Sequence, residues 1–346
     1  MYSSVSRGPS GLFSLIERLN AMRILPDRFV MLMVLAVILA LIFPQLGTAD
    51  GPLKLGLVTE FGIALVFFLH GANLERQKLV TGLKNWRVHL LIQTTTFIVF
   101  PIVGLVLYFG LKAYLPDFLL LGFFFLAALP STVSSSVAMT ALARGNVPVA
   151  VFNATLSGLL GMVITPALMS IVTATGESQF SVVDAMIDIT ITLLLPFILG
   201  QLARPLLKSL LAKYKSFVSK IDRTVILLIV FSSFAESTAG GVWAQFSVLQ
   251  FAVTISLVLV FLGLAFSYTI FASRRLSLPL DDESATVFCG STKSLANGAP
   301  IAQILFAGNP NMGLIMLPLM LYHQLQLMAC AVMAQRYARK TEALEA

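Results

Sequence analysis

Long apolar runs follow one another along almost the whole chain, and short segments with proline, glycine or charged residues separate them. A helix that crosses a bilayer core of about 30 Å needs about 20 apolar residues. The pattern therefore predicts an all-α membrane protein with ten transmembrane helices, at residues 29–46, 55–74, 88–109, 117–142, 147–172, 181–203, 221–238, 248–272, 283–306 and 312–334.

The amino-acid composition agrees with a chain that lies mostly in lipid. The 346 residues are 58% hydrophobic and 11% charged, whereas soluble domains have about 25% charged residues. The net charge of +7 does not indicate a nucleic-acid partner, because the basic residues fall in short loops between apolar runs. Cys289 and Cys330 lie in apolar surroundings and form neither a CxxC metal motif nor a disulfide framework.

The positions of the basic residues predict which side of the membrane each loop faces. Of the 23 lysines and arginines, all but Lys54, Lys112 and Lys293 lie in the terminal tails or in the loops after even-numbered spans. Cytoplasmic loops of membrane proteins carry an excess of these residues. We therefore expect a multi-pass protein of the plasma (inner) membrane with both termini in the cytoplasm.

Ten spans divide into two units of five, which insert with opposite orientation because five is an odd number. An S-T-x-S motif stands in the fourth span at 131–134 and in the ninth span at 291–294, which supports such a 5+5 inverted repeat. The predicted organisation is a cytoplasmic tail at 1–28, a first repeat at 29–172, a connecting loop at 173–180, a second repeat at 181–336 and a cytoplasmic tail at 337–346.

Spans four and nine carry polar residues where the other spans are apolar. Pro130 precedes a run of hydroxyl residues in span four, and span nine contains CGSTKSLANGAP at 289–300. Proline removes a backbone donor and clashes with the preceding turn, so we expect both helices to be broken near the bilayer centre. Freed backbone groups in lipid need protein or water partners. Two such breaks predict a shared polar cavity in which helix N-termini attract an anion and carbonyls attract a cation. Close packing of small residues is the plainer alternative.

Lys293 is the most informative residue of span nine. A lysine at the centre of a membrane helix costs about 2.5–3.5 kcal/mol on insertion scales, so it normally faces a cavity or a partner. We expect this cavity-facing position rather than snorkelling to the interface. Lys293 would then bind an anionic solute or replace a coupling cation. The residues predicted to bind solute are Lys293, Ser294, Asn297, Ser134 and Ser135.

Several short motifs occur in a characteristic order: FFLHGANLERQKL at 67–79, HLLIQTTTF at 89–97, LARGNV at 142–147, STKSL at 291–295, and FAGN and YHQ after it. Together they resemble the bile acid:sodium symporter family, and within it the bile-acid-symporter-like subgroup, from about residue 29 to 336. The resemblance implies two inverted repeats divided into a panel domain and a core domain. It also implies that broken helices four and nine cross in the core, beside two sodium sites and the solute cavity.

The resemblance further implies which residues bind a coupling ion. Gln93 matches a sodium-ligating glutamine of helix three, and Ser136 matches a serine of helix four. Asn153 and Thr155 lie beside the helix-five positions at which the family has hydroxyl groups. The expected ion-binding residues are Ser136, Gln93, Asn153, Thr155, Ser291 and Thr292. As buried amides, Gln93 and Asn153 are also common cross-links between helices.

Four positions depart from the family pattern. Val137 replaces an asparagine, and Ala150 and Ala154 replace the helix-five hydroxyl residues. The family's glutamate on helix nine falls near Ser291, and the nearest charge here is Lys293. A fixed cation repels a nearby sodium ion strongly in a low-dielectric site. Sodium and protons therefore both stay open as coupling ions.

These features predict a secondary active transporter, not an enzyme, that moves a small organic anion by alternating access with sodium or proton coupling. We expect no cofactor, and the sequence predicts no oligomeric state. The chain has no GxxxxGK[ST] loop, which argues against ATP-driven pumping. Two alternatives are a non-transporting regulator of membrane ion homeostasis and an intramembrane hydrolase that uses a serine and Lys293.

Overall fold

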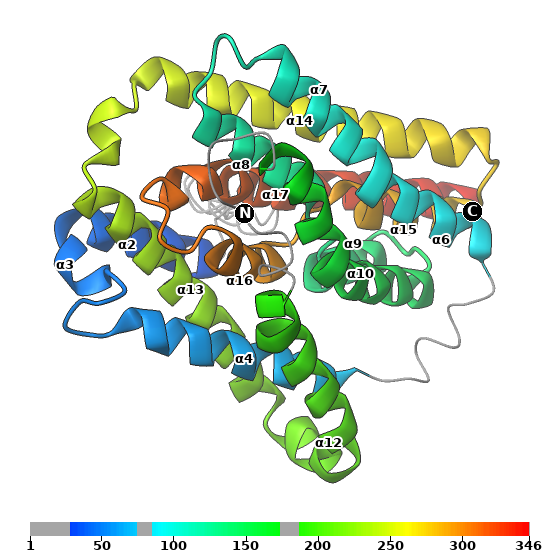
Figure 1. Ribbon diagram of the computed structural model, residues 1–346. Helices are drawn as coiled ribbons and strands as arrows, with labels where there is room; N and C mark the ends of the chain where they lie inside the picture. The colour runs from blue at the N-terminus through cyan, green and yellow to red at the C-terminus, as the bar shows by residue number, and fades with distance from the viewer. Residues whose placement is uncertain (1–27, 75–84, 174–186, 346) are drawn as a thin grey trace, which may run out of the picture.

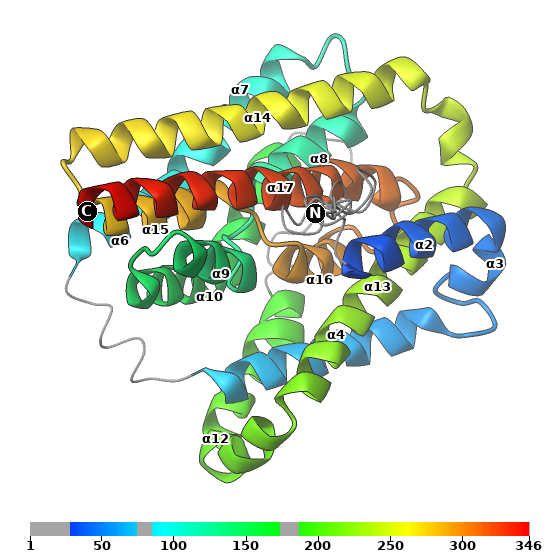
Figure 2. The same ribbon diagram turned by 180° about the vertical axis from the view of Figure 1, so that it is seen from behind.

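The computed structural model describes residues 28–74, 85–173 and 187–345, and all regular elements within these ranges are helices (Figures 1 and 2). The first part contains α2 (Arg28–Ile42), α3 (Pro44–Gly47), α4 (Leu55–Asn73), α6 (Trp86–Thr94), the π-helix η1 (Thr95–Val99), α7 (Phe100–Gly110), α8 (Asp117–Ala128), α9 (Ser134–Leu142) and α10 (Val147–Thr173). The second part contains the π-helix η2 (Thr190–Leu194), α12 (Leu195–Lys213), α13 (Lys215–Ala239), the 3-10 helix η3 (Val242–Gln245), α14 (Val248–Arg275), α15 (Leu280–Ser291), α16 (Leu295–Leu305) and α17 (Met312–Glu345).

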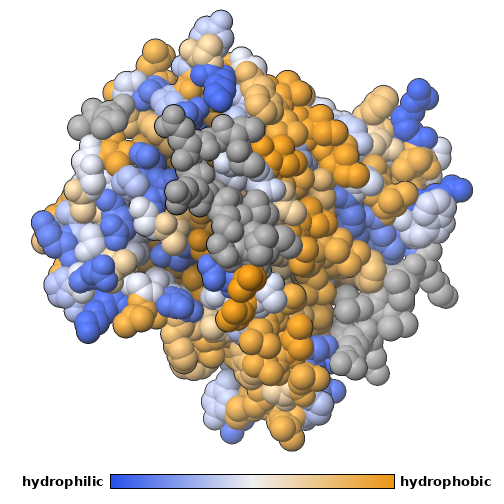
Figure 3. All heavy atoms as spheres, in the orientation of Figure 1, coloured by the Kyte–Doolittle hydropathy of each residue, from blue (hydrophilic) through white to orange (hydrophobic). Residues whose placement is uncertain are grey.

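The protein is a multi-pass membrane protein. Six helices in the described ranges are long and apolar enough to cross a bilayer, at Leu55–Asn73, Trp86–Gly110, Val147–Thr173, Ile187–Lys213, Val248–Arg275 and Met312–Leu344. Large apolar side chains are exposed on them, including Leu206 at 84% and Val248 at 87%. Figure 3 shows that apolar residues cover the middle of this face and that hydrophilic residues gather toward its left and right sides. Lipid contact explains such exposed apolar surface.

The helices pack in two groups. The small group consists of α2, α3, α4, α12 and α13, in which α4 packs along α12 and α13 packs along α2. The large group consists of α6, α7, α8, α9, α10, α14, α15, α16 and α17. Figures 1 and 2 show α14 in the upper part of the view and α4 in the lower part, with α17 between them. Helix α13 contacts α16 and α17, so it joins the two groups.

Two segments interrupt the large group at the positions where the sequence carries its polar motifs. Helix α8 ends at Ala128 and α9 begins at Ser134; α15 ends at Ser291 and α16 begins at Leu295. The residues directly after the first helix of each pair, Leu129 and Thr292, have extended backbones with ψ of 150° and 148°. Pro130 disfavours the helical conformation in the residue before it, which explains the end of α8.

A proline also explains the π-helix between α6 and α7. Pro101 has no N–H, so the carbonyl of Thr96 lacks the donor that a further π-turn would provide. The N–H of Phe100 is directed instead to the carbonyl of Thr95, one residue earlier. Single π-turns inside α-helices occur frequently at functional sites. Here the π-turn leaves the Thr96 carbonyl open to a side-chain donor.

Some helix bounds differ from the sequence prediction. Helix α17 continues to Glu345, so the expected tail at 337–346 is helical over almost its whole length. No glycine or proline follows Arg336 to end the helix, and most residues there favour helix. The connecting loop at 173–180 and the tail at 1–28 lie outside the described residues, except at Thr173 and Arg28, as does the start of the span expected at 181–203.

Candidate functional site

The two interruptions contact each other inside the large helix group. The N–H of Ser294 donates to the carbonyl of Pro130 at 3.0 Å. The hydroxyl oxygens of Ser131 and Thr292 are 3.2 Å apart and share a hydrogen bond. All three of the hydroxyl-bearing residues here are buried. The non-helical segments at 129–133 and 292–294 therefore form one crossing, in which each satisfies backbone groups of the other.

Lys293 points into the carbonyl end of α8. Its Nζ atom donates to the carbonyls of Leu129 at 2.7 Å, Ala127 at 2.8 Å and Thr96 at 3.2 Å. The same atom lies 4.5 Å from the ring centroid of Phe100, a distance that permits a cation–π interaction. The residue is 0% exposed. Its side chain therefore joins the end of α8 to the π-turn of η1.

Helix α17 holds the backbone of Lys293 in place. The side-chain amide of Gln326 accepts a hydrogen bond from the Lys293 N–H at 2.7 Å and donates to the Lys293 carbonyl at 2.9 Å. Tyr322 donates its hydroxyl proton to the carbonyl of Ser291 at 2.6 Å. Both partners are buried. These contacts replace the backbone hydrogen bonds that the interruption removes between α15 and α16.

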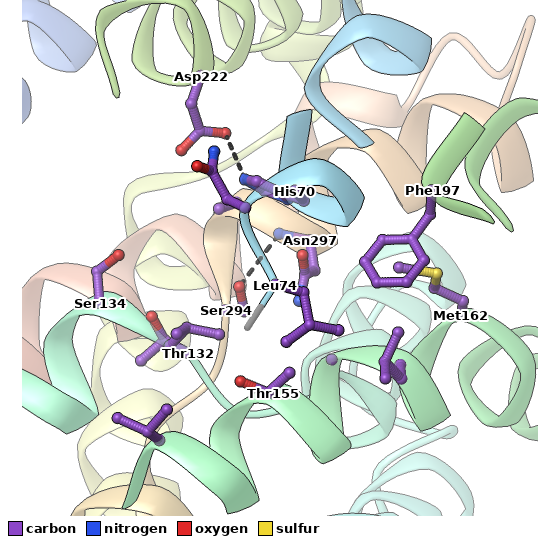
Figure 4. Close-up of a pocket in the computed structure, with 16 residues that line it drawn as sticks. His70, Leu74, Thr132, Ser134, Thr155, Met162, Phe197, Asp222, Ser294 and Asn297 are labelled. Carbon is purple, nitrogen blue, oxygen red and sulfur yellow. Dashed lines mark hydrogen bonds and ion pairs between the residues drawn. The ribbon is translucent and has the colours of Figure 1, made fainter. Parts of the chain in front are cut away.

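A cavity of about 330 Å³ lies where the first turns of α9 and α16 approach the small helix group. Figure 4 shows Thr132 and Ser134 on one side of it and Ser294 and Asn297 on another. The side chain of Ser294 caps α16 by accepting the N–H of Asn297 at 3.1 Å. Helix α9 has Val133 at its start and no side-chain cap. The first N–H groups of α9 are thus available to a bound group.

Helices α4, α12 and α13 supply the opposite wall. Nε2 of His70 lies 3.5 Å from a carboxylate oxygen of Asp222, and both residues line the cavity with Phe197 (Figure 4). Asn73 also lines it. A second cavity of about 570 Å³ shares His70, Asn73, Ser134 and Asp222 with the first, so the two adjoin. Arg204 and Lys208 of α12 line this second cavity.

The structure brings four of the predicted site residues to the first cavity and places two others beside it. The four lining residues are Ser134, Ser294, Asn297 and Thr155. Ser135 donates its hydroxyl proton to Oγ1 of Thr132 at 3.3 Å, at the start of α9. Lys293 is not among the residues that line the cavity, because its side chain turns away toward the carbonyls of α8.

Three of the four hydroxyl groups predicted to bind an ion donate to carbonyls. Ser136, Ser291 and Thr292 each donate to the carbonyl four residues earlier in their own segment. Gln93 donates through Nε2 to the backbone and side-chain oxygens of Asn153 at 3.1 and 3.3 Å. Its Oε1 atom is buried and has no hydrogen-bond partner among the described residues. Gln93 thus offers an acceptor oxygen that no donor in the described ranges occupies.

The surroundings of these residues are apolar. Ala150 and Ala154 belong to a buried cluster with Ile92, Ala285 and Cys289, against which Val137 packs. None of these side chains carries an oxygen atom. The three departures from the resembled pattern on helices four and five thus fall in one packed region. In the described parts of the chain, no group of three or more His, Cys, Asp or Glu residues is placed to hold a metal ion.

Sequence reasoning missed several residues of the site. No sequence pattern predicts that His70 and Asp222 meet, because their pairing depends on the packing of α4 against α13. Gln326 is a buried amide in an apolar span, three residues after His323, with which it also forms a hydrogen bond at 2.9 Å. The available signal for Gln326 is the group of polar residues His323, Gln324 and Gln326 within an otherwise apolar span.

Comparisons with known proteins give consistent matches over nearly the whole chain. A family model described as SBF-like CPA transporter family matches residues 27–339. An uncharacterized protein of Pseudomonas aeruginosa is 42% identical, over 92% of this chain and 95% of that protein. "Putative symporter YfeH" of Escherichia coli is 41% identical over the same shares of both chains. "Sodium/bile acid cotransporter 7" of Rattus norvegicus is 30% identical, over 90% of this chain and 92% of that protein.

Proposed function

The chain belongs to the SBF-like CPA transporter family, and from this membership we propose that it is a secondary active transporter of a small organic anion. The resemblance drawn from the sequence motifs is thereby confirmed at the level of the family. The observation that carries the proposal is the cavity of about 330 Å³ lined by the first turns of both α9 and α16. Ligand pockets of proteins commonly measure about 300–1,000 Å³.

The proposal includes ten membrane spans in two inverted repeats. Four more spans complete the six long apolar helices: α2, α13 and the pairs α8–α9 and α15–α16, each pair crossing the membrane as one interrupted span. The repeats are residues 29–172 and 181–336. The small helix group then corresponds to the panel domain and the large group to the core domain. The matching S-T-x-S motifs at the two interruptions support the repeat.

The proposed solute carries a negative charge. Helix N-termini bear a partial positive charge and unpaired N–H groups, which suit an anion. The uncapped start of α9 and the neighbouring start of α16 offer two such ends to one cavity. Leu159, Met162 and Phe197 supply an apolar wall, which suits a solute with an apolar body. Some relatives are named as bile acid cotransporters, so bile acids belong among the first solutes to test.

The second cavity provides a route to the binding site. Arg204 and Lys208 line it and attract anions to its mouth. Arg204 and Lys208 follow the sixth predicted span, at the end that the distribution of basic residues assigns to the cytoplasm. In this state the cavities therefore open to the cytoplasm of a plasma-membrane protein. Alternating access then requires the small group to move against the large group, so that the same cavity opens to the other side. The crossing of 129–133 and 292–294 is the fixed point of this motion.

Sodium or protons would couple to the solute. The free Oε1 atom of Gln93 and the adjoining oxygens of Asn153 favour a cation near helix three. The apolar side chains at Val137, Ala150 and Ala154 leave such an ion few oxygen ligands. A thermal-shift series with and without sodium at several pH values distinguishes the two ions, since sodium-independent and pH-dependent binding of solute indicates protons.

The proposal is tested by ligand-induced stabilisation followed by uptake. Purified protein is heated with carboxylates and sulfonates of increasing apolar size, up to a bile acid, and with uncharged analogues of matched size. A ligand at 100 times its Kd stabilises the native state by about 2.7 kcal/mol. We expect stabilisation by anions but not by the matched neutral compounds, and uptake of the same anions into vesicles that contain the protein. Equal effects of charged and neutral compounds would contradict an anion site.

A further inference from the structure

Three carbonyl oxygens around the end of α8 share one property, namely that no backbone donor is placed to pair with them. The carbonyls of Ala127 and Leu129 lie at the C-terminal end of α8, where the last carbonyls of a helix lack intrahelical partners. The N–H of Ser131, which a continued helix would direct to Ala127, donates instead to Oγ of Ser157 at 2.9 Å. The carbonyl of Thr96 is opened by Pro101 in the π-turn.

Such a set of carbonyls is a cation site. The C-terminal end of a helix carries a partial negative charge, and converging backbone carbonyls replace the hydration shell of monovalent cations in ion-selective proteins. Buried carbonyls without donors in a membrane protein each cost several kcal/mol. The interruption of α8 therefore creates a requirement for N–H or O–H donors at this point, and the partial negative charge of the helix end favours a positively charged donor.

Lys293 meets this requirement with its own side chain. An ammonium group has three N–H donors, and its Nζ atom has three carbonyl acceptors, at 2.7, 2.8 and 3.2 Å. A neutral amine has only two N–H donors, so the geometry matches the charged form. The face of Phe100 at 4.5 Å adds a further interaction that favours a cation.

We infer that the Lys293 ammonium is a tethered cation that occupies a monovalent-cation site formed by the carbonyls of Thr96, Ala127 and Leu129. The site itself is independent of what the protein transports. Its consequence for coupling rests on the proposed function: the crossing keeps its positive charge through the transport cycle and needs no sodium ion at this position.

The matched pair of variants Lys293→Ala and Lys293→Met tests the inference. Alanine leaves the carbonyls and an open space, whereas methionine fills the space with an apolar chain of similar length. Melting of the purified full-length proteins is measured at constant ionic strength in chloride salts of sodium, potassium, methylammonium and choline. Choline serves as the control because it is too large for the space that one ammonium group occupies.

We expect both variants to melt several degrees below the wild type in choline. The Lys293→Ala protein should recover saturably with sodium, potassium or methylammonium, more than the wild type responds to the same ions, while Lys293→Met should not recover. A Lys293→Ala protein that responds to these cations no more than the wild type overturns the inference. So does a Lys293→Met protein as stable as the wild type.

If neither Lys293→Ala nor Lys293→Met folds, Lys293→Arg is compared with Lys293→Gln. Folded protein from Lys293→Arg alone supports the need for a positive charge, and folded protein from Lys293→Gln with unchanged melting in choline overturns it. Because these measurements use no solute, their outcome does not depend on the anion-binding experiments. If the variants behave as expected but no anion binds, the inference about Lys293 stands and the proposed transport function is wrong.

Discussion

The backbone N–H of Ser294 donates to the carbonyl oxygen of Pro130 at 3.0 Å, which fixes the two interruptions of the fold to each other. Neither segment satisfies its own backbone groups, because each is non-helical inside a packed region. A change that displaces one segment therefore disturbs the other. This coupling makes the crossing the part of the molecule at which small substitutions have the largest expected effects.

Gly161 of α10 provides a direct test of how tightly the crossing packs. A Cβ atom at this position would lie 2.6–2.9 Å from ring atoms of Pro130. We expect Gly161→Ala to destabilise the protein by about 1–3 kcal/mol, the usual cost of overpacking, as a lower melting temperature. The control is Gly263→Ala on α14, where a Cβ atom meets nothing within 4 Å. That variant should melt at or above the wild-type temperature.

Ser157 tests the hydrogen-bonding requirement of the same region. Its hydroxyl oxygen accepts the buried N–H of Ser131 at 2.9 Å. In Ser157→Ala this N–H loses its partner, and an unsatisfied buried donor costs about 1–3 kcal/mol. On the same helix, the hydroxyl of Ser170 is exposed and donates locally to Ala167, so Ser170→Ala should change stability by less than about 0.5 kcal/mol. Equal melting temperatures for the two variants would refute this account of the crossing.

Substitutions of Val133 separate the effect of a charge on stability from its effect on anion binding at the first turn of α9. A carboxylate near a helix N-terminus is favourable by about 0.3–1 kcal/mol, so Val133→Asp should fold at least as well as the wild type. The same carboxylate repels a bound anion, and two unit charges 4 Å apart near a protein surface interact by about 4 kcal/mol. We expect Val133→Asp to lose the thermal shift caused by anions, and the neutral, similarly shaped Val133→Asn to keep it. Loss in both variants would indicate a steric effect.

Gly71 and Gly200 test the packing of α4 against α12 in the small group. A Cβ atom on Gly71 would lie 2.0 Å from the carbonyl oxygen of Phe197, and one on Gly200 would lie 1.9 Å from that of Phe68. Backbone atoms cannot move aside as side chains do, so alanine at either position should separate the two helices. We expect a clear loss of melting temperature for each variant. The melting temperature of the double variant should be little lower than that of either single variant, because both substitutions disrupt the same contact between α4 and α12.

The sequence indicated the positions at which α8 and α15 end better than the directions of the side chains beyond them. Pro130 and the polar run around Lys293 marked the interruptions, because proline and charge conflict with an unbroken membrane helix. The acceptors of Lys293 were not predictable, since one of them is the carbonyl of Thr96, opened by a proline in another span. The wall formed by His70 and Asp222 also depends on how two distant spans pack, which no local pattern encodes.

Alternating access of the cavity is measured most directly by the accessibility of Ser134, which is exposed and lines both cavities. The Ser134→Cys variant, with the buried Cys289 and Cys330 replaced by alanine, is treated with a membrane-impermeant thiol reagent from either side of the membrane. The control positions are the half-buried Ser170, expected to react from outside only, and the exposed Ser216, expected to react from the cytoplasm only. We predict that Ser134→Cys reacts from both sides and that a stabilising anion slows both reactions. Reaction from one side only, under every solute and ion condition, would contradict transport by this cavity.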